Sequence, residues 1–183
     1  DPGRLPQLSE MIHYPYLFAG YLALFFTALN LLPIGQLDGG HVLFGLFPRR
    51  HAQISLVVFT LFLAFAGLGV IRPSLPVEEL VIRIPLYLGF LYFCLSKSGL
   101  TPLNRLTLAL SLAAAQYLLS FFYLYLEVYQ GWLFFAFMLV LVMGLVHPEV
   151  VGLQAVDSKR KVLGWIALLI FILCFSPQPF QMS

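Results

Sequence analysis

Residues 30–41 of the chain, NLLPIGQLDGGH, place polar and helix-breaking residues inside one of its most apolar stretches. Asp38 carries the most weight, because a carboxylate within a membrane costs about 2.5–3.5 kcal/mol unless an ion, a proton relay or a metal offsets it. The same side chain could instead cap free backbone amides at the start of a helix. His41 follows one helical turn later, so both side chains could face one ion, although a single histidine is more often a hydrogen-bonded polar group. The sequence alone leaves both interpretations of Asp38 open.

Asn30 also has two interpretations. Its amide could donate hydrogen bonds to a substrate carbonyl or clamp an extended backbone. Alternatively, it could satisfy carbonyl groups that Pro33 frees, because proline removes a helical hydrogen bond. The sequence does not show which groups lie near the Asn30 side chain, so both interpretations stay open.

The composition of the chain indicates a membrane protein. Of its 183 residues, 61% are hydrophobic and only 10% are charged, and the mean hydropathy is +0.93. Soluble domains are typically about 45–50% apolar and roughly 25% charged. We therefore expect an all-α polytopic membrane protein in contact with the lipid bilayer. The net charge of +2 is too small to indicate binding to nucleic acid.

A membrane-spanning helix needs about 20 mostly apolar residues, and the apolar runs predict about five to six of them. No internal repeat or low-complexity linker divides the chain. We therefore expect a single membrane domain over residues 1–183, with a motif-bearing part at 1–71 and additional helices and a tail at 72–183. The expected spans are 16–32, 54–71, 77–95, 106–126, 131–146 and 162–175.

The first of these spans is expected to be broken. Residues 14–47 are too many for one crossing, because a continuous helix of that length would overshoot a hydrocarbon core of roughly 30 Å. We predict a helix to about Leu32, an unwound stretch at 33–37 and a short helix at 38–47. Glycines at 35, 39 and 40 permit unusual backbone angles and close approach. Such irregular backbone is tolerated only inside protein or beside a wet cavity, where it often builds binding sites.

Basic residues orient the predicted spans. If the spans alternate in direction, most lysines and arginines fall on one side of the membrane, and positive residues mark the cytoplasmic face. The motif is then expected near the cytoplasmic side, with both chain ends facing outward. The basic residues on the cytoplasmic side are Arg49, Arg50, Lys97, Arg105, Lys159, Arg160 and Lys161.

The motif resembles the second signature of the site-2 protease family, the intramembrane zinc metalloproteases. That signature has an asparagine, a proline three residues later, and a Leu-Asp-Gly whose aspartate is eight residues after the asparagine, as in Asn30, Pro33 and residues 37–39 here. In the tail, His-Pro-Glu at 147–149, the basic 159–161 and Pro-Gln-Pro-Phe at 177–180 are similar to bacterial and plastid members. The resemblance implies a multi-pass protein of a bacterial inner membrane or a plastid-like membrane.

The resemblance also implies roles for individual residues. Asp38 would be the third zinc ligand, and Asn30 would stabilise the substrate backbone or the developing oxyanion. The parent enzyme would use zinc-activated water to hydrolyse a peptide bond in a transmembrane segment of a protein substrate. The unwound stretch, including Pro33, Gly35 and Gln36, could bind an unfolded substrate segment by strand addition.

One part of the family's active site is absent from the sequence. The two other zinc ligands and the general base come from a His-Glu-x-x-His helix, and none of His13, His41, His51 or His147 begins such a motif. Asp38 alone would not hold zinc, because catalytic sites normally use three protein ligands. The chain starts at Asp1 without a signal peptide, so we expect an inactive carboxy-terminal part that partners a missing amino-terminal half. The alternative is a non-catalytic homologue that acts as a membrane scaffold or binds a partner.

Two other classes fit the sequence less well. A transporter or channel predicts further acids inside the spans, but Glu78, Glu79, Glu127 and Glu149 lie near span ends. An intramembrane aspartyl protease needs two aspartates that share one proton. Besides Asp38, the chain has aspartates only outside its apolar runs.

Overall fold

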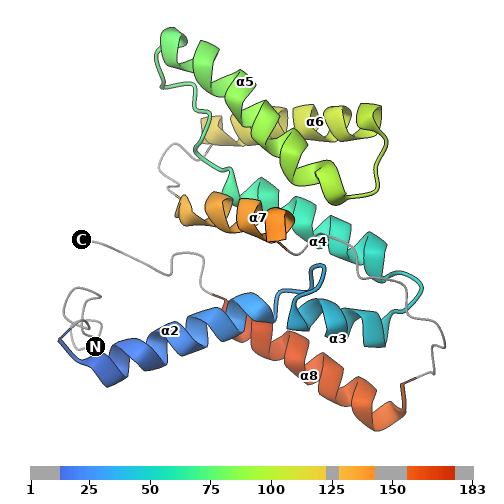
Figure 1. The fold of residues 1–183 in the computed structure, drawn as a ribbon. Coiled ribbons are helices and arrows are strands. Elements are labelled where there is room, and N and C mark those ends of the chain that lie inside the picture. The colour runs from blue at the N-terminus through green and yellow to red at the C-terminus, as the bar shows by residue number, and fades with distance from the viewer. Residues whose placement is uncertain (1–12, 123–127, 143–155, 176–183) are drawn as a thin grey trace.

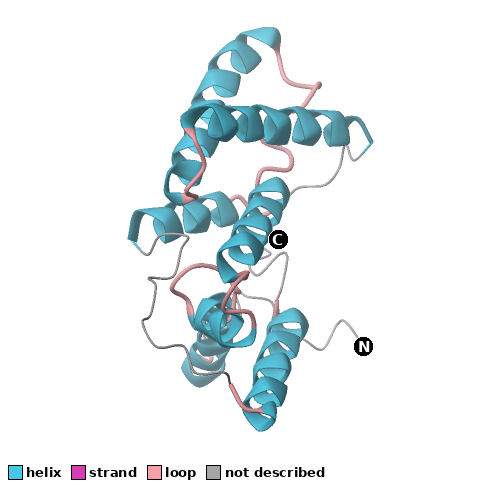
Figure 2. Ribbon diagram, turned by 90° about the vertical axis from the view of Figure 1, so that its right-hand side faces the viewer, coloured by secondary structure: helices cyan, strands magenta, loops and turns pink. Residues whose placement is uncertain are grey.

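The computed structural model describes residues 13–122, 128–142 and 156–175 (Figure 1). Within these ranges the chain forms seven α-helices and one short 3₁₀ helix, and no strand (Figure 2). The all-α prediction is therefore confirmed for the described residues. The α-helices are α2 Pro15–Asn30, α3 Asp38–Leu46, α4 His51–Ala66, α5 Val77–Cys94, α6 Pro102–Phe122, α7 Gly131–Val142 and α8 Ser158–Cys174, and the 3₁₀ helix η2 is Leu95–Lys97.

Each predicted span corresponds to one helix, with boundaries that differ by a few residues. Helix α6 begins at Pro102, earlier than expected, because proline fits the first helical turn, where its missing N–H would have no partner. Helix α4 ends at Ala66, earlier than expected, and Gly67 follows as its C-cap. The expected ends of the spans at 126 and 146 lie outside the described residues.

Two helical segments are long and apolar enough to cross a membrane by length and composition. They are Val77–Lys97, which joins α5 to η2, and Pro102–Phe122. Helices α2, α4 and α7 are apolar but shorter. Of the five to six predicted spans, two are thus supported by helix length and composition in the described part of the chain. The others stay predictions.

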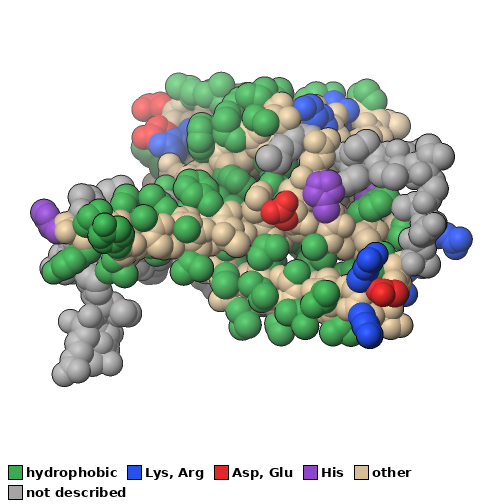
Figure 3. All heavy atoms as spheres, turned by 60° about the horizontal axis from the view of Figure 1, so that its bottom comes forward, with side chains coloured by type: hydrophobic (Ala, Val, Ile, Leu, Met, Phe, Trp, Pro, Cys, Tyr) green, Lys and Arg blue, Asp and Glu red, His purple; other side chains and the backbone are tan. Residues whose placement is uncertain are grey.

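Large apolar side chains cover much of the outer surface. Phe122 is 82% exposed, Leu173 is 75% exposed, and helix α8 has no buried residue. Figure 3 shows one face on which hydrophobic side chains are abundant and charged ones are few. Soluble monomers rarely expose contiguous apolar patches larger than a few hundred Å². A lipid environment accounts for this surface.

The helices lie in three layers (Figure 1). The pair α5 and α6 forms one outer layer, α4 and α7 lie in the middle, and α2, α3 and α8 form the other outer layer. Trp132 of α7 anchors the middle layer, with its ring 5.7 Å from that of Phe62 in a T-shaped arrangement. This packing supports α4, against which the motif-bearing α3 lies.

A buried polar cluster joins three of these helices at the end of α4. Tyr87 Oη donates to Gln116 Oε1 at 2.9 Å, and Gln116 Nε2 donates to the carbonyls of Leu63 and Ala64 at 2.9 and 3.1 Å. A side chain on Gly67 would overlap both polar groups. The last carbonyls of a helix lack partners within it. The Leu63 carbonyl also accepts from the Gly67 N–H, whereas Gln116 of α6 supplies the Ala64 carbonyl with a partner.

Candidate functional site

The break in the first helix is present where the sequence predicted it. Helix α2 ends at Asn30 and α3 begins at Asp38. Between them the chain forms turns, and Leu37 is extended (φ −67°, ψ 162°) as the N-cap of α3. Gly35 has a positive φ of 55°, a conformation that glycine adopts at little cost. The predicted unwound stretch at 33–37 is confirmed, with the transition starting slightly earlier.

The two glycines after Asp38 let α3 approach the backbone of the break. A Cβ atom added to Gly39 would overlap the carbonyl oxygen of Leu31, and one added to Gly40 would overlap the carbonyl oxygen of Gly35. In both cases the obstacle is backbone, which cannot rotate away as a side chain can. The first turn of α3 therefore lies directly against the residues that unwind.

Apolar side chains hold the break in place. Leu32, Ile34 and Leu37 are buried, with exposed fractions of 2%, 0% and 5%. Gln36 precedes Leu37 and Asp38 follows it, and both of these polar residues are exposed. The unwound stretch is thus anchored in the protein on one side and presents polar groups on the other.

Asn30 and Asp38 meet across the break. Asn30 Nδ2 donates a hydrogen bond to Asp38 Oδ2 at 3.1 Å. Asp38 makes no capping hydrogen bond, since Leu37 is the N-cap of α3 and no side chain caps that helix. The capping interpretation of Asp38 is therefore not supported, and Asn30 contacts the carboxylate rather than freed carbonyls. The side-chain amide of Asn30 has two N–H groups, and this bond uses one of them.

Ser55 of α4 holds the centre of the break. The backbone N–H of Gly35 donates to Ser55 Oγ at 2.9 Å in a buried environment, and Ser55 is 3% exposed. This contact joins positions 20 residues apart in the sequence. Sequence reasoning missed Ser55, because a single serine in an apolar helix carries no signal of its partner.

The backbone donors of the break are largely used inside the protein. Ile34 N–H bonds to the carbonyl of Leu32 at 2.8 Å, and Leu37 N–H bonds to that of Ile34 at 3.2 Å. With Gly35 N–H bound to Ser55, these three amides are not free for a substrate strand in this conformation. Strand addition would have to displace them, whereas the exposed side chain of Gln36 is accessible.

The described residues do not complete a metal site. His41 is exposed on α3 one turn after Asp38, but no group of three or more His, Cys, Asp or Glu side chains that could hold a metal occurs in the described part of the chain. His51 Nδ1 lies 2.8 Å from the carbonyl oxygen of Pro48. A three-ligand site cannot be built from the described residues, and the role of Asp38 as a zinc ligand stays a prediction. The tail motif at 147–149 and 177–180 lies outside them.

Residues 5–72 match the sequence pattern of Peptidase family M50, the site-2 protease family. This segment is similar to members of that family. The match covers α2, α3 and α4, and so includes the Asn30–Asp38 pair and the serine that holds the break. The site-2 protease motif is therefore present together with the helices that position it.

A second comparison agrees with the first. Over 55 residues the chain is 43% identical to a protein of Arabidopsis thaliana named "Probable zinc metallopeptidase EGY3, chloroplastic". The aligned stretch covers 30% of this chain and 10% of that relative, so the chain matches about a tenth of the relative's length. No solved structure matches the chain.

Replacing Ser55 with alanine tests how the break is held. The Gly35 N–H would be left buried without its side-chain acceptor, which typically costs about 1–3 kcal/mol. We expect a lower unfolding midpoint in detergent for Ser55→Ala, measured by circular dichroism. Ser111→Ala is the matched control, because the Ser111 hydroxyl is exposed and bonds only to Thr107 of its own helix. Equal midpoints for the two variants would contradict the role of Ser55.

Proposed function

We propose that this chain supplies part of the active site of a site-2-protease-like intramembrane zinc metalloprotease. Its substrate would be a membrane protein that is cleaved within a transmembrane segment. The observation that carries the proposal is the 3.1 Å hydrogen bond from Asn30 to Asp38 across a broken apolar helix. The break exposes an oriented carboxylate, with the polar side chains of Asn30, Gln36 and His41 beside it, at an interruption of an apolar helix.

Each residue of the pair has a role in this proposal. Asp38 Oδ1 would bind zinc while Oδ2 accepts from Asn30, because ligating carboxylates are usually held by hydrogen bonds of their own. The second N–H of Asn30 would donate to a substrate carbonyl, and the exposed side chain of Gln36 would contact the substrate backbone. Pro33 and Gly35 would take part once substrate displaces the bond from Gly35 to Ser55. Zinc bound at such a site activates a water molecule for attack on the peptide bond.

The two histidine ligands and the general base would come from outside this chain. None of the four histidines in the sequence begins a His-Glu-x-x-His motif, and the relative named as a zinc metallopeptidase is about ten times longer than the matched stretch. We propose that the complete site forms when an amino-terminal half supplies that helix. The assembled enzyme would be multi-pass, with the motif near the cytoplasmic end where Arg49 and Arg50 follow α3.

A non-catalytic scaffold is the second candidate. The sequence, in which no histidine begins a His-Glu-x-x-His motif, is compatible with it. A scaffold would keep the fold of α2 to α4 but would neither bind zinc nor cleave a substrate. The two candidates therefore differ in metal content and in chemistry.

Metal removal distinguishes these candidates. The full gene product, purified in detergent, should contain about one zinc ion per chain by elemental analysis, in line with a three-ligand catalytic site. It should cleave a transmembrane peptide, lose that activity on chelation, and regain it when zinc is added. A full gene product without zinc and without cleavage would support the scaffold, and cleavage that survives chelation would exclude the metalloprotease.

A further inference from the structure

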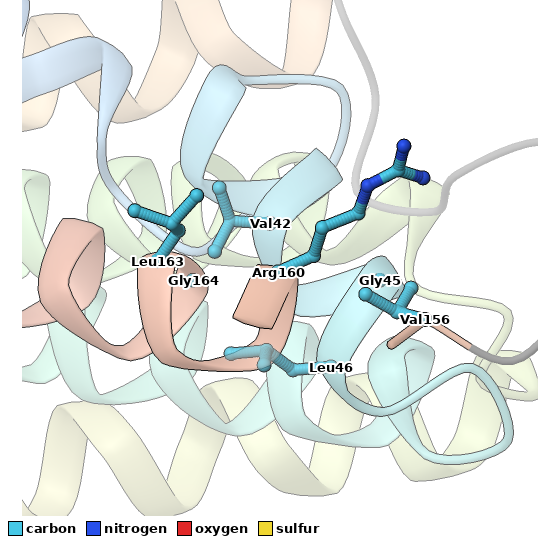
Figure 4. Close-up of a pocket in the computed structure, with 7 residues that line it drawn as sticks. All are labelled: Val42, Gly45, Leu46, Val156, Arg160, Leu163 and Gly164. Carbon is cyan, nitrogen blue, oxygen red and sulfur yellow. The ribbon is translucent and has the colours of Figure 1, made fainter. Parts of the chain in front are cut away.

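A cavity of about 280 Å³ lies between α3 and α8, on the side of α3 away from α4 (Figure 4). Its walls are apolar apart from one arginine. The residues that line it include Val42, Gly45 and Leu46 of α3 and Arg160, Leu163 and Gly164 of α8. This volume is just below the range for small-molecule pockets, about 300–1,000 Å³.

Two glycines line the cavity. A Cβ atom on Gly164 would come within 3.0 Å of Leu46 Cδ2, and one on Gly45 would lie 3.8 Å from Val156 Cγ2. Helices α3 and α8 are in extensive contact around the cavity. The space is therefore an apolar slot between two packed helices.

Positive charge gathers at one end of this slot. In Figure 4 the aliphatic stem of Arg160 lines the cavity and its guanidinium points away from it, and the side chain is 79% exposed. Lys159 and Lys161 flank it and are exposed. Asp157 Oδ1 accepts from the Arg160 backbone N–H at 2.9 Å and lies 4.0 Å from its Nε. An exposed pair at that distance neutralises little of the charge.

The mouth of the slot also has the features of a membrane interface. The Trp165 ring packs against the Phe47 ring at 5.8 Å and is 56% exposed. Arg49 and Arg50 follow Phe47 after a single proline and are exposed. Tryptophan and basic residues concentrate where the hydrocarbon region meets the headgroups. Apolar walls therefore lead to a cationic rim at headgroup level.

We propose that this cavity binds an acyl chain of an anionic phospholipid, with the lipid phosphate on the Arg160 guanidinium. The apolar walls match the chain, and the charge at the rim matches the headgroup. A free phosphate would use the rim but leave the apolar slot empty, and a neutral lipid would fill the slot but leave Arg160 without an anion. The bound lipid packs against α3 and α8 together, and so braces the helix that begins with Asp38.

Lipid retention in detergent tests this site. The full chain is purified in an uncharged detergent, mixed with phosphatidylglycerol or phosphatidylcholine of the same chain length, and examined by native mass spectrometry. We expect phosphatidylglycerol to be retained about fivefold more than phosphatidylcholine, the gain of one Lys or Arg contact with an anionic lipid. Arg160→Gln should remove that preference. Lys161→Gln is the matched control, since it removes a neighbouring charge that does not line the cavity.

Several outcomes would overturn the proposal. These are equal retention of the two lipids, equal losses in Arg160→Gln and Lys161→Gln, or displacement of the lipid by glycerol phosphate at equal concentration. The last would show a soluble-phosphate site. A second variant, Val42→Phe, fills the slot and should lower retention of phosphatidylglycerol several-fold. If circular dichroism shows that this variant does not fold, Arg160→Gln decides alone, because it changes only an exposed group.

Discussion

Replacing Asp38 with alanine in the full gene product is expected to reduce proteolysis by more than about 100-fold, because loss of even an outer partner of a metal ligand costs about 10–100-fold. The substitution would remove the only carboxylate that the motif presents and the acceptor of the Asn30 amide. Bound zinc, measured by elemental analysis beside the cleavage rate, should fall with activity. The chain itself should fold normally, because Asp38 is exposed and caps nothing.

Two further variants sharpen this test. Asp38→Asn has nearly the same side-chain shape and can still accept a hydrogen bond from Asn30. A loss of bound zinc in this variant would therefore show that the negative charge of Asp38 is needed to bind the metal. Asp157→Ala removes another exposed aspartate, which caps α8 through the Arg160 N–H, and it should leave zinc and cleavage close to those of the wild type. Retained zinc with full activity in Asp38→Ala would exclude Asp38 as a ligand.

Replacing Gly39 with alanine is expected to disrupt the broken helix itself. The new Cβ would overlap the backbone carbonyl of Leu31, so α3 could form only by moving away from the end of α2. Overpacking of this kind costs about 1–3 kcal/mol, and sometimes more. We expect a clearly lower midpoint in thermal unfolding followed by circular dichroism, together with loss of zinc and activity in the full gene product.

The chain offers matched controls for this substitution. Gly20 in α2 and Gly89 in α5 have no atom within 4 Å of an added Cβ. Alanine at those positions should be neutral or slightly stabilising, because glycine within a helix is less favourable than alanine by roughly 0.5–1 kcal/mol. Midpoints that fall equally for Gly39→Ala and Gly20→Ala would show that close approach at Gly39 is not what requires glycine.

The sequence predicted the break well because the rules that set it are local. Pro33 lacks an N–H, Gly35 adopts a positive φ, and polar residues at a fixed spacing interrupt an apolar run. Each of these effects acts within one or two turns of the chain. The end of α2 and the start of α3 could therefore be predicted to within two residues, and the motif identified the family later supported by the match over residues 5–72.

What holds the break could not be predicted in the same way. Ser55 reaches Gly35 from 20 residues away, and Gln116 reaches the end of α4 from more than 50 residues away. In each case the sequence shows a polar residue in an apolar helix without indicating its partner. Partners at such separations depend on how whole helices pack, because many packings would satisfy the same local pattern.

By itself the sequence determined a membrane-type composition, a broken first helix, and a carboxylate and an amide placed on either side of the break. Only the tertiary structure decided that Asn30 and Asp38 bond to each other, that Ser55 fixes Gly35, and that α8 packs on α3 around an apolar cavity. The reason is physical. Backbone strain and hydropathy are properties of neighbouring residues, whereas a hydrogen bond across a break or a slot between two helices exists only once the helices have been brought together.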